Sequence, residues 1–120
     1  MHFASIMAMM EEAEHEFLRH INVPLFRTVS EGKISWPRVS AHCDFKSPAR
    51  FEDVLEIDVG VQRLGRRSVT YQFIMRIESR TVAVGTMTAA CCLVAKSAIS
   101  PVDIPGDIRD LLEDHQIESA

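Results

Sequence analysis

Acidic side chains capable of acid–base chemistry are concentrated near the start of the chain. Glu11, Glu12, Glu14 and Glu16 lie in a segment of helical periodicity, and a carboxylate can act as a general base. At about 100° per residue, helical geometry brings Glu14 closer to the apolar stripe than Glu11 and turns Glu12 away from it. Alternatively, all four glutamates form a solvated helix face that pairs with Arg19 and its neighbours.

The start of the same helix offers donors for an anion. Backbone N–H groups in the first turn of a helix have no partner within it, and the helix dipole adds positive charge there. Those near Phe3 and Ala4 could therefore stabilise an oxyanion, and His2 is a candidate general base or substrate contact. The competing interpretation is a frayed terminus in which these groups are hydrated.

A basic cluster marks a predicted turn between two strands. It consists of Arg63, Arg66 and Arg67, with Ser68 beside them. Guanidinium groups bind phosphate through charge-assisted, bidentate hydrogen bonds, and a serine hydroxyl can add one more donor. The cluster is either a phosphate-binding site or an ordinary turn that its charge keeps soluble.

The three cysteines, Cys43, Cys91 and Cys92, do not predict a disulfide framework. Their number is odd, and adjacent residues of a strand point to opposite faces. The histidines nearest in sequence, His42 and His20, form no specific arrangement for a thiol nucleophile, and the histidine spacing predicts no metal site. We therefore interpret the cysteines as small buried residues in a protein of the reducing cytoplasm.

Length and charge exclude several classes of protein. With 120 residues, the chain fits a single domain that spans residues 1–120. The balance of 13 basic and 17 acidic residues, a net charge of -4, argues against broad nucleic-acid or membrane surfaces. Glutamates interrupt the first apolar segment, so we expect neither a signal peptide nor a membrane span there.

Hydrophobic periodicity predicts an α+β domain in which one long helix packs on an antiparallel sheet. Apolar residues at helical spacing indicate a helix from Ala4 to His20, ended by Asn22 and Pro24. Alternating residues indicate strands, and the tail contains a short helix. The strands are predicted over 36–45, 55–61, 69–77 and 82–95, and the second helix over 107–114.

The two faces of this sheet differ in composition. Small residues in the last strand, including Ala83 and Gly85, would let the helix approach closely. Strict alternation places Arg38, His42 and Arg76 on the other face, together with Gln62. Because that face is mixed, we expect another subunit to cover part of it.

The order and the amino-acid sequences of these segments resemble those of the hotdog-fold acyl-CoA thioesterases of the 4-hydroxybenzoyl-CoA thioesterase type. The resemblance extends over nearly the whole chain. It rests on an ordered set of residues at matching spacings rather than on a single signature motif. The set consists of the helix HFASIMAMMEEAEHEFLR, the positions Pro48, Asp53, Leu55, Gly65 and Ser68, and the strand VAVGTMTAACCLVA.

The resemblance implies hydrolysis of an acyl-CoA thioester to a free acid and CoA, without a metal or redox cofactor. It matches the Phe3 N–H to the family's oxyanion position and Glu11 to a glutamate frequent in relatives. In such an enzyme the basic cluster of Arg63, Arg66 and Arg67, with Ser68, is a candidate to hold the CoA phosphates. The resemblance also implies a homodimer or homotetramer with the active site between subunits.

One departure from the family pattern bears on activity. Relatives carry a first strand and an Asp-x-Asp-x-x-Gly loop before the position of Met1, and neither is present in this sequence. From this we expect either a start codon placed too far downstream or a shortened form with altered activity. The alternative function is a non-catalytic hotdog protein that binds acyl-CoA or serves as an assembly subunit.

Overall fold

The computed structural model describes residues 3–47, 54–96 and 98–117. It opens with helix α1 (Phe3–His20) and closes with the short helix α2 (Gly106–Glu113). The predicted helices, 4–20 and 107–114, are thus confirmed to within one residue at each end. No helix in these ranges has the length and hydrophobicity that a membrane crossing requires.

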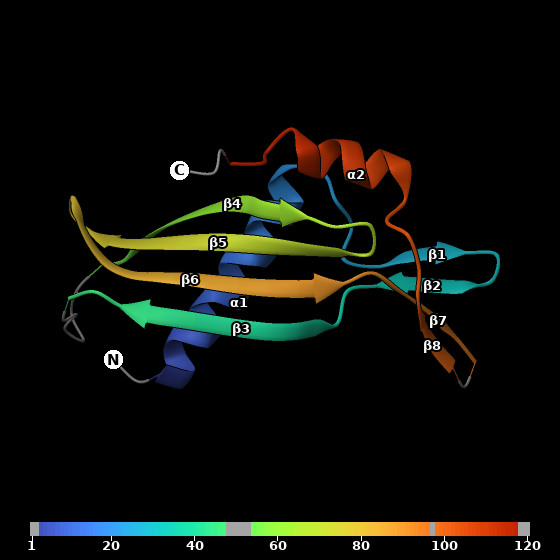
Figure 1. Cartoon of the computed structure of the whole chain (residues 1–120), viewed down its shortest axis with the longest axis horizontal. Coiled ribbons are helices and arrows are strands. Elements are labelled where there is room, and N and C mark those ends of the chain that lie inside the picture. The colour runs from blue at the N-terminus through green and yellow to red at the C-terminus, as the bar shows by residue number, and fades with distance from the viewer. Residues whose placement is uncertain (1–2, 48–53, 97, 118–120) are drawn as a thin grey trace.

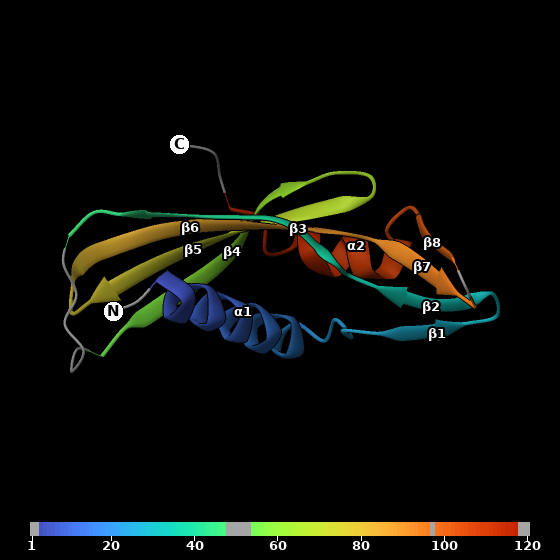
Figure 2. The ribbon, with the colours of Figure 1, turned by 90° about the horizontal axis from the view of Figure 1, so that it is seen from below.

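Four long strands form the main sheet, and α1 lies across one of its faces (Figures 1 and 2). In spatial order they are β3 (Arg38–Phe45), β6 (Arg80–Ala90), β5 (Ser68–Ile77) and β4 (Glu56–Leu64). Every neighbouring pair is antiparallel. This confirms the predicted α+β arrangement of one long helix packed on an antiparallel sheet.

A second sheet of four short strands extends from the end of the main sheet (Figure 1). Its order is β1 (Arg27–Val29), β2 (Gly32–Ser35), β7 (Cys92–Ala95) and β8 (Ala98–Pro101). The sequence did not reveal this sheet, because strands of three or four residues are too short to show alternation.

The prediction of one continuous strand over 82–95 is wrong. The segment divides at Cys91 into β6 and β7, which belong to different sheets. Cys91 donates its N–H to the Arg67 carbonyl at 2.7 Å and accepts at its own carbonyl from Val102 at 2.9 Å. The first bond extends the β5–β6 register and the second extends the β7–β8 register, so Cys91 is the residue at which the chain passes from one sheet to the other.

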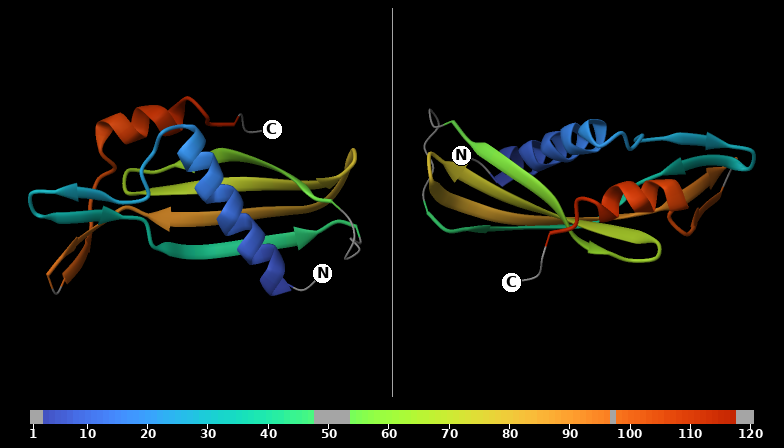
Figure 3. Two further views of the ribbon diagram at one scale, coloured as in Figure 1. Left: turned by 180° about the vertical axis from the view of Figure 1, so that it is seen from behind. Right: turned by 90° about the horizontal axis from the view of Figure 1, so that it is seen from above.

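The apolar stripe of α1 is buried against the main sheet. Figure 3 shows from the opposite side how the helix lies across that sheet. The side chain of Met10 on α1 packs directly on Gly85 of β6. Its Cε would lie only 2.7 Å from a Cβ added to the glycine. The same Cβ would lie 3.2 Å from the His42 carbonyl oxygen on β3. The close approach predicted from small residues is therefore confirmed at Gly85.

A bidentate ion pair ties the second sheet to α2. Arg27 on β1 donates from Nη1 to Asp107 Oδ1 at 3.0 Å and from Nη2 to Oδ2 at 2.7 Å. Hydrogen bonding to Arg27 holds the pKa of the Asp107 carboxyl below its ordinary value of 3.8. Two segments 80 residues apart in sequence are thereby connected.

We expect Gly85→Val to lower the free energy of unfolding by about 1–3 kcal/mol, because the added methyl groups would displace Met10 and press on β3. Urea denaturation followed by circular dichroism would measure the change. Gly106→Ala is the matched control, since an added Cβ there meets nothing within 4 Å. Equal stability of Gly85→Val and the wild type would contradict the close packing.

The Arg27–Asp107 pair should make stability depend on pH in the acid range. Because the pKa of Asp107 is lower in the folded than in the unfolded state, its contribution is complete above about pH 4 and is lost as pH falls further. Thermal melts between pH 7 and pH 2.5 should show a shallower acid decline for Asp107→Asn than for the wild type. Asp110→Asn, on the same helix, should keep the steeper decline.

Candidate functional site

A buried carboxylate lies within the apolar stripe of α1. Glu14 is only 4% exposed, and its Oε1 accepts a hydrogen bond from Nη2 of Arg38 on β3. A buried carboxylate is costly unless a cation and hydrogen-bond donors compensate it. Arg38 supplies both, so this pair holds α1 against the start of β3.

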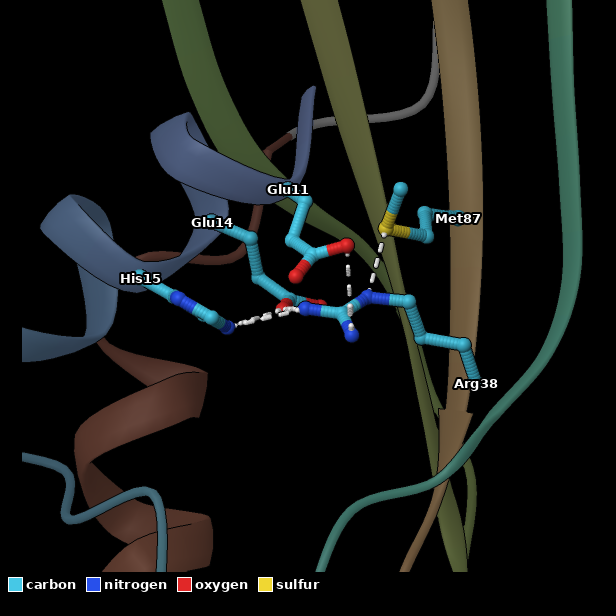
Figure 4. Close-up of polar contacts among 5 residues, drawn as sticks. All are labelled: Glu11, Glu14, His15, Arg38 and Met87. Atoms are coloured by element: carbon cyan, nitrogen blue, oxygen red, sulfur yellow. Dashed lines mark hydrogen bonds and ion pairs between the residues drawn. The ribbon is translucent and has the colours of Figure 1, made fainter. Parts of the chain in front are cut away.

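Arg38 reaches three further side chains (Figure 4). Its Nε lies 3.2 Å from Sδ of Met87 on β6, and its Nη2 lies 3.0 Å from Nε2 of His15. Its Nη1 lies 3.9 Å from Oε2 of Glu11. We call Glu11, Glu14, His15 and Arg38 the arginine cluster.

A β-bulge puts Arg38 on this face of the sheet. Arg38 pairs with Ala89 and Ser40 with Thr88, so Val39 is an extra residue in β3. An inserted residue reverses the alternation on one side of the bulge. The prediction that Arg38 lies on the outer face is therefore wrong, whereas His42 does lie there, 3.0 Å from Asp44.

One guanidinium serves both carboxylates of the arginine cluster. His15 Nε2 lies 3.0 Å from Nη2 of Arg38 and 3.7 Å from Oε1 of Glu14, so its ring borders both members of the buried pair. Burial raises the pKa of Glu14, and the charge of Arg38 offsets part of that rise. Burial, and secondarily the charge of Glu14, also raises the pKa of Tyr71 on β5. One cation thus faces two carboxylates, Glu14 and Glu11.

The four glutamates of α1 have different environments. Glu14 is buried while Glu11 and Glu12 are exposed, which confirms the order deduced from helical geometry. Glu16 accepts from Arg19 Nη1 at 3.2 Å on the surface, as the solvated-face interpretation predicts. That interpretation is wrong for Glu14. Glu11 is both exposed to solvent and close to a cation, because its side chain is 52% exposed and lies beside Arg38.

The predicted oxyanion donor is far from these carboxylates within one chain. Phe3 is the first residue of α1, and His2 lies outside the described residues. At 1.5 Å per residue, the Phe3 N–H is about 12 Å from Glu11 along the helix axis and about 16 Å from Glu14. Glu14 is thus further than Glu11 from the first turn of α1.

The basic turn is held by a single aspartate. Asp103 Oδ1 accepts from Nε of Arg67 at 2.8 Å and from Nε of Arg66 at 3.3 Å, and these bonds keep the pKa of Asp103 low. The Ser68 carbonyl accepts from Gly65 N–H at 2.8 Å and closes the turn. Arg63 lies near the end of β4, where its backbone is opposite Thr70 of β5. The turn lies at the end of the main sheet opposite the N-terminus of α1 (Figure 1).

A groove of about 880 Å³ runs along another flank of α1, beside β4. His15 lines this groove and also belongs to the arginine cluster, whereas Glu11 and Glu14 are not among the lining residues. The other lining residues are Met9, Glu12, Ala13, Glu16, Phe17, Arg19, His20, Leu55, Ile57 and Val59.

The cysteines are unsuited to nucleophilic chemistry. All three are free thiols, with Cys91 and Cys92 buried and Cys43 partly buried. Burial raises the pKa of Cys91 to about 11 and, with the nearby charge of Asp44, also raises that of Cys43. Since the thiolate is the reactive form, these thiols are unreactive near neutral pH. The interpretation of the cysteines as packing residues is confirmed for Cys91 and Cys92.

Arg38 and His15 are the site residues that sequence reasoning missed. The bulge that redirects Arg38 has no sequence signature, because Val39 continues an ordinary alternating pattern. His15 carries a weak signal, since it follows Glu11 by four residues and therefore shares its helix flank.

Solved structures share this fold. A gentisyl-coenzyme A thioesterase matches with a TM-score of 0.75 and 27% identity, over 92% of this chain and 85% of that one. A protein from Thermus thermophilus matches with a TM-score of 0.80 and 24% identity, over 96% and 85% of the two chains. A 1,4-dihydroxy-2-naphthoyl-CoA thioesterase from Synechocystis matches with a TM-score of 0.79 and 18% identity, over 94% and 82%.

These likenesses define the class of the protein as a hotdog-fold domain, in which the sheet wraps the long helix α1. The family follows from the sequence, because the model described as the thioesterase superfamily matches residues 1–84. The chain belongs to the thioesterase superfamily.

Proposed function

We propose that this protein hydrolyses an acyl-CoA thioester to a free acid and CoA, with Glu11 as the general base. The observation that carries the proposal is the position of the Glu11 carboxylate, half exposed at the edge of the arginine cluster. Glu11 takes a proton from water as the water oxygen attacks the thioester carbonyl carbon. The resulting tetrahedral oxyanion then collapses, the C–S bond breaks, and CoA leaves as a thiolate.

Accessibility favours Glu11 over Glu14 as the base. A general base must come within hydrogen-bond distance of the proton that it removes. Glu14 is 4% exposed and its Oε1 already accepts from Arg38, so water and substrate have little access to it. Glu11 lies 3.9 Å from the same guanidinium, beyond a direct hydrogen bond, and keeps its lone pairs available.

The oxyanion donor in this proposal is the Phe3 N–H of a second copy of the chain. An axial separation of about 12 Å between the backbone positions of Phe3 and Glu11 favours a donor from another chain over one on the same helix. Two copies arranged about a twofold axis would give two equal sites, each with Glu11 from one chain and Phe3 from the other. This arrangement agrees with the homodimer or homotetramer that the resemblance implies.

For CoA, the proposal assigns the phosphates to Arg66 and Arg67, with Ser68 and Arg63 as flanking donors. Asp103 fixes the Nε edge of both turn arginines, which orients the guanidinium groups in advance. A CoA ester as substrate is supported by the likeness to the gentisyl-coenzyme A thioesterase. Its acyl group makes gentisyl-CoA a suitable first probe alongside aliphatic acyl-CoAs.

We expect Glu11→Gln to lower kcat by about 100- to 10,000-fold, because the amide cannot accept the proton from water. Release of CoA from a panel of aromatic and aliphatic acyl-CoAs, followed with a thiol reagent, would measure the effect. Glu12→Gln is the matched control on the neighbouring residue and should keep the wild-type kcat.

Two results would count against this function. Hydrolysis of none of the acyl-CoAs by the wild type would exclude the thioesterase activity, and saturable acyl-CoA binding without turnover would then favour the non-catalytic alternative. A Glu11→Gln variant as active as the wild type would exclude Glu11 as the base.

The paired change Arg66→Ala with Arg67→Ala should raise KM for acyl-CoA by roughly 10-fold or more, since charged hydrogen bonds to phosphate would be lost. Hydrolysis of the same acyl group on N-acetylcysteamine, which lacks the phosphates, should be unchanged. Arg19→Ala serves as the control for a general loss of positive charge. An unchanged KM for acyl-CoA would remove the turn from the binding site.

A further inference from the structure

We infer that Arg38 is a positioning residue that holds the Glu11 carboxylate in place for the attack of water. The inference rests on the proposed function, because it concerns the same carboxylate, and it adds a residue that acts through Glu11 rather than on the substrate. Its basis is the set of contacts around the Arg38 guanidinium (Figure 4).

The first observation is that Arg38 is anchored on several sides. Its guanidinium donates to the buried Glu14 on α1, lies 3.0 Å from His15 Nε2 and lies 3.2 Å from Met87 Sδ on β6. The side chain is only 30% exposed. A long side chain fixed in this way has already lost its rotamer freedom, so its Nη1 is a stationary charge at the surface.

The second observation is how the two carboxylates share this charge. Glu14 takes the direct hydrogen bond, while Glu11 lies 3.9 Å from Nη1. One guanidinium thus lies between two carboxylates. Arg38 therefore attracts the exposed Glu11 side chain toward one position without forming a tight salt bridge that would block its reaction with water.

The geometry requires an arginine. One planar guanidinium presents separate N–H groups toward Glu14, Glu11, His15 and Met87. A lysine at position 38 would present all its donors from one nitrogen, whereas the guanidinium faces Glu14 and Glu11 with different nitrogens. The residue is thus suited to connect a buried anchor to a surface carboxylate.

Removal of Arg38 alone would leave Glu14 buried without its cation and could unfold the protein. The decisive variant therefore changes both partners, Glu14→Leu with Arg38→Met, and fills the same space with apolar groups. Melting temperature and oligomeric state should match the wild type. We expect kcat to fall about 10- to 100-fold with KM for acyl-CoA nearly unchanged, because Glu11 is present but not held.

Two further variants separate positioning from folding. Arg38→Lys should retain a kcat between those of the wild type and the double variant, because part of the charge remains. Asp58→Leu with Arg76→Met removes an ion pair on the outer face of the same sheet and is the matched control. This control should keep the wild-type kcat and KM.

The outcomes distinguish this inference from the proposed function. If the wild type hydrolyses acyl-CoA and the folded Glu14→Leu/Arg38→Met variant keeps the wild-type kcat, the role of Arg38 is refuted while the activity stands. A selective loss of kcat, partly restored with Arg38→Lys, supports the inference. A wild type without activity on any acyl-CoA would refute both.

Discussion

The burial of one carboxylate constrains the rest of this structure. Glu14 lies in the helix stripe that must pack on the sheet, so α1 can bury its apolar residues only where a cation meets that carboxylate. Arg38 provides the cation from the start of β3. The pair therefore fixes how the helix lies across the sheet, and the other contacts of α1, including Met10 at Gly85, accompany that placement.

The sequence predicted those parts of the fold that depend on long periodic segments. The helix stripe and the alternation of the long strands gave the α+β class and nearly the correct bounds. The second sheet escaped prediction because its strands are short. The change of sheet at Cys91 did so because it depends on which strand pairs on either side of this residue, β5 before it and β8 after it. These pairings join residues that are not neighbours in sequence, which periodicity does not report.

Prediction of the site residues was limited in the same way, because it succeeded only for properties that depend on residues close in sequence. Helical geometry identified Glu14 as the carboxylate nearest the apolar stripe, because that property depends only on angles along one helix. Arg38 could not be found in this way, since its orientation depends on a bulge in β3. The partner of Arg66 and Arg67 was equally hidden, because Asp103 lies more than 30 residues further along the chain.

Because of the bulge at Val39, the length of β3 decides whether the arginine cluster can form. Arg38 faces the helix because one residue too many is present in β3. Deletion of that residue would turn Arg38 to the opposite face, although every charged residue of the arginine cluster would still be present in the sequence. The arginine cluster therefore depends on the length of β3 as much as on residue identities, and a chain with the same charged residues but one residue fewer in this strand would lack it.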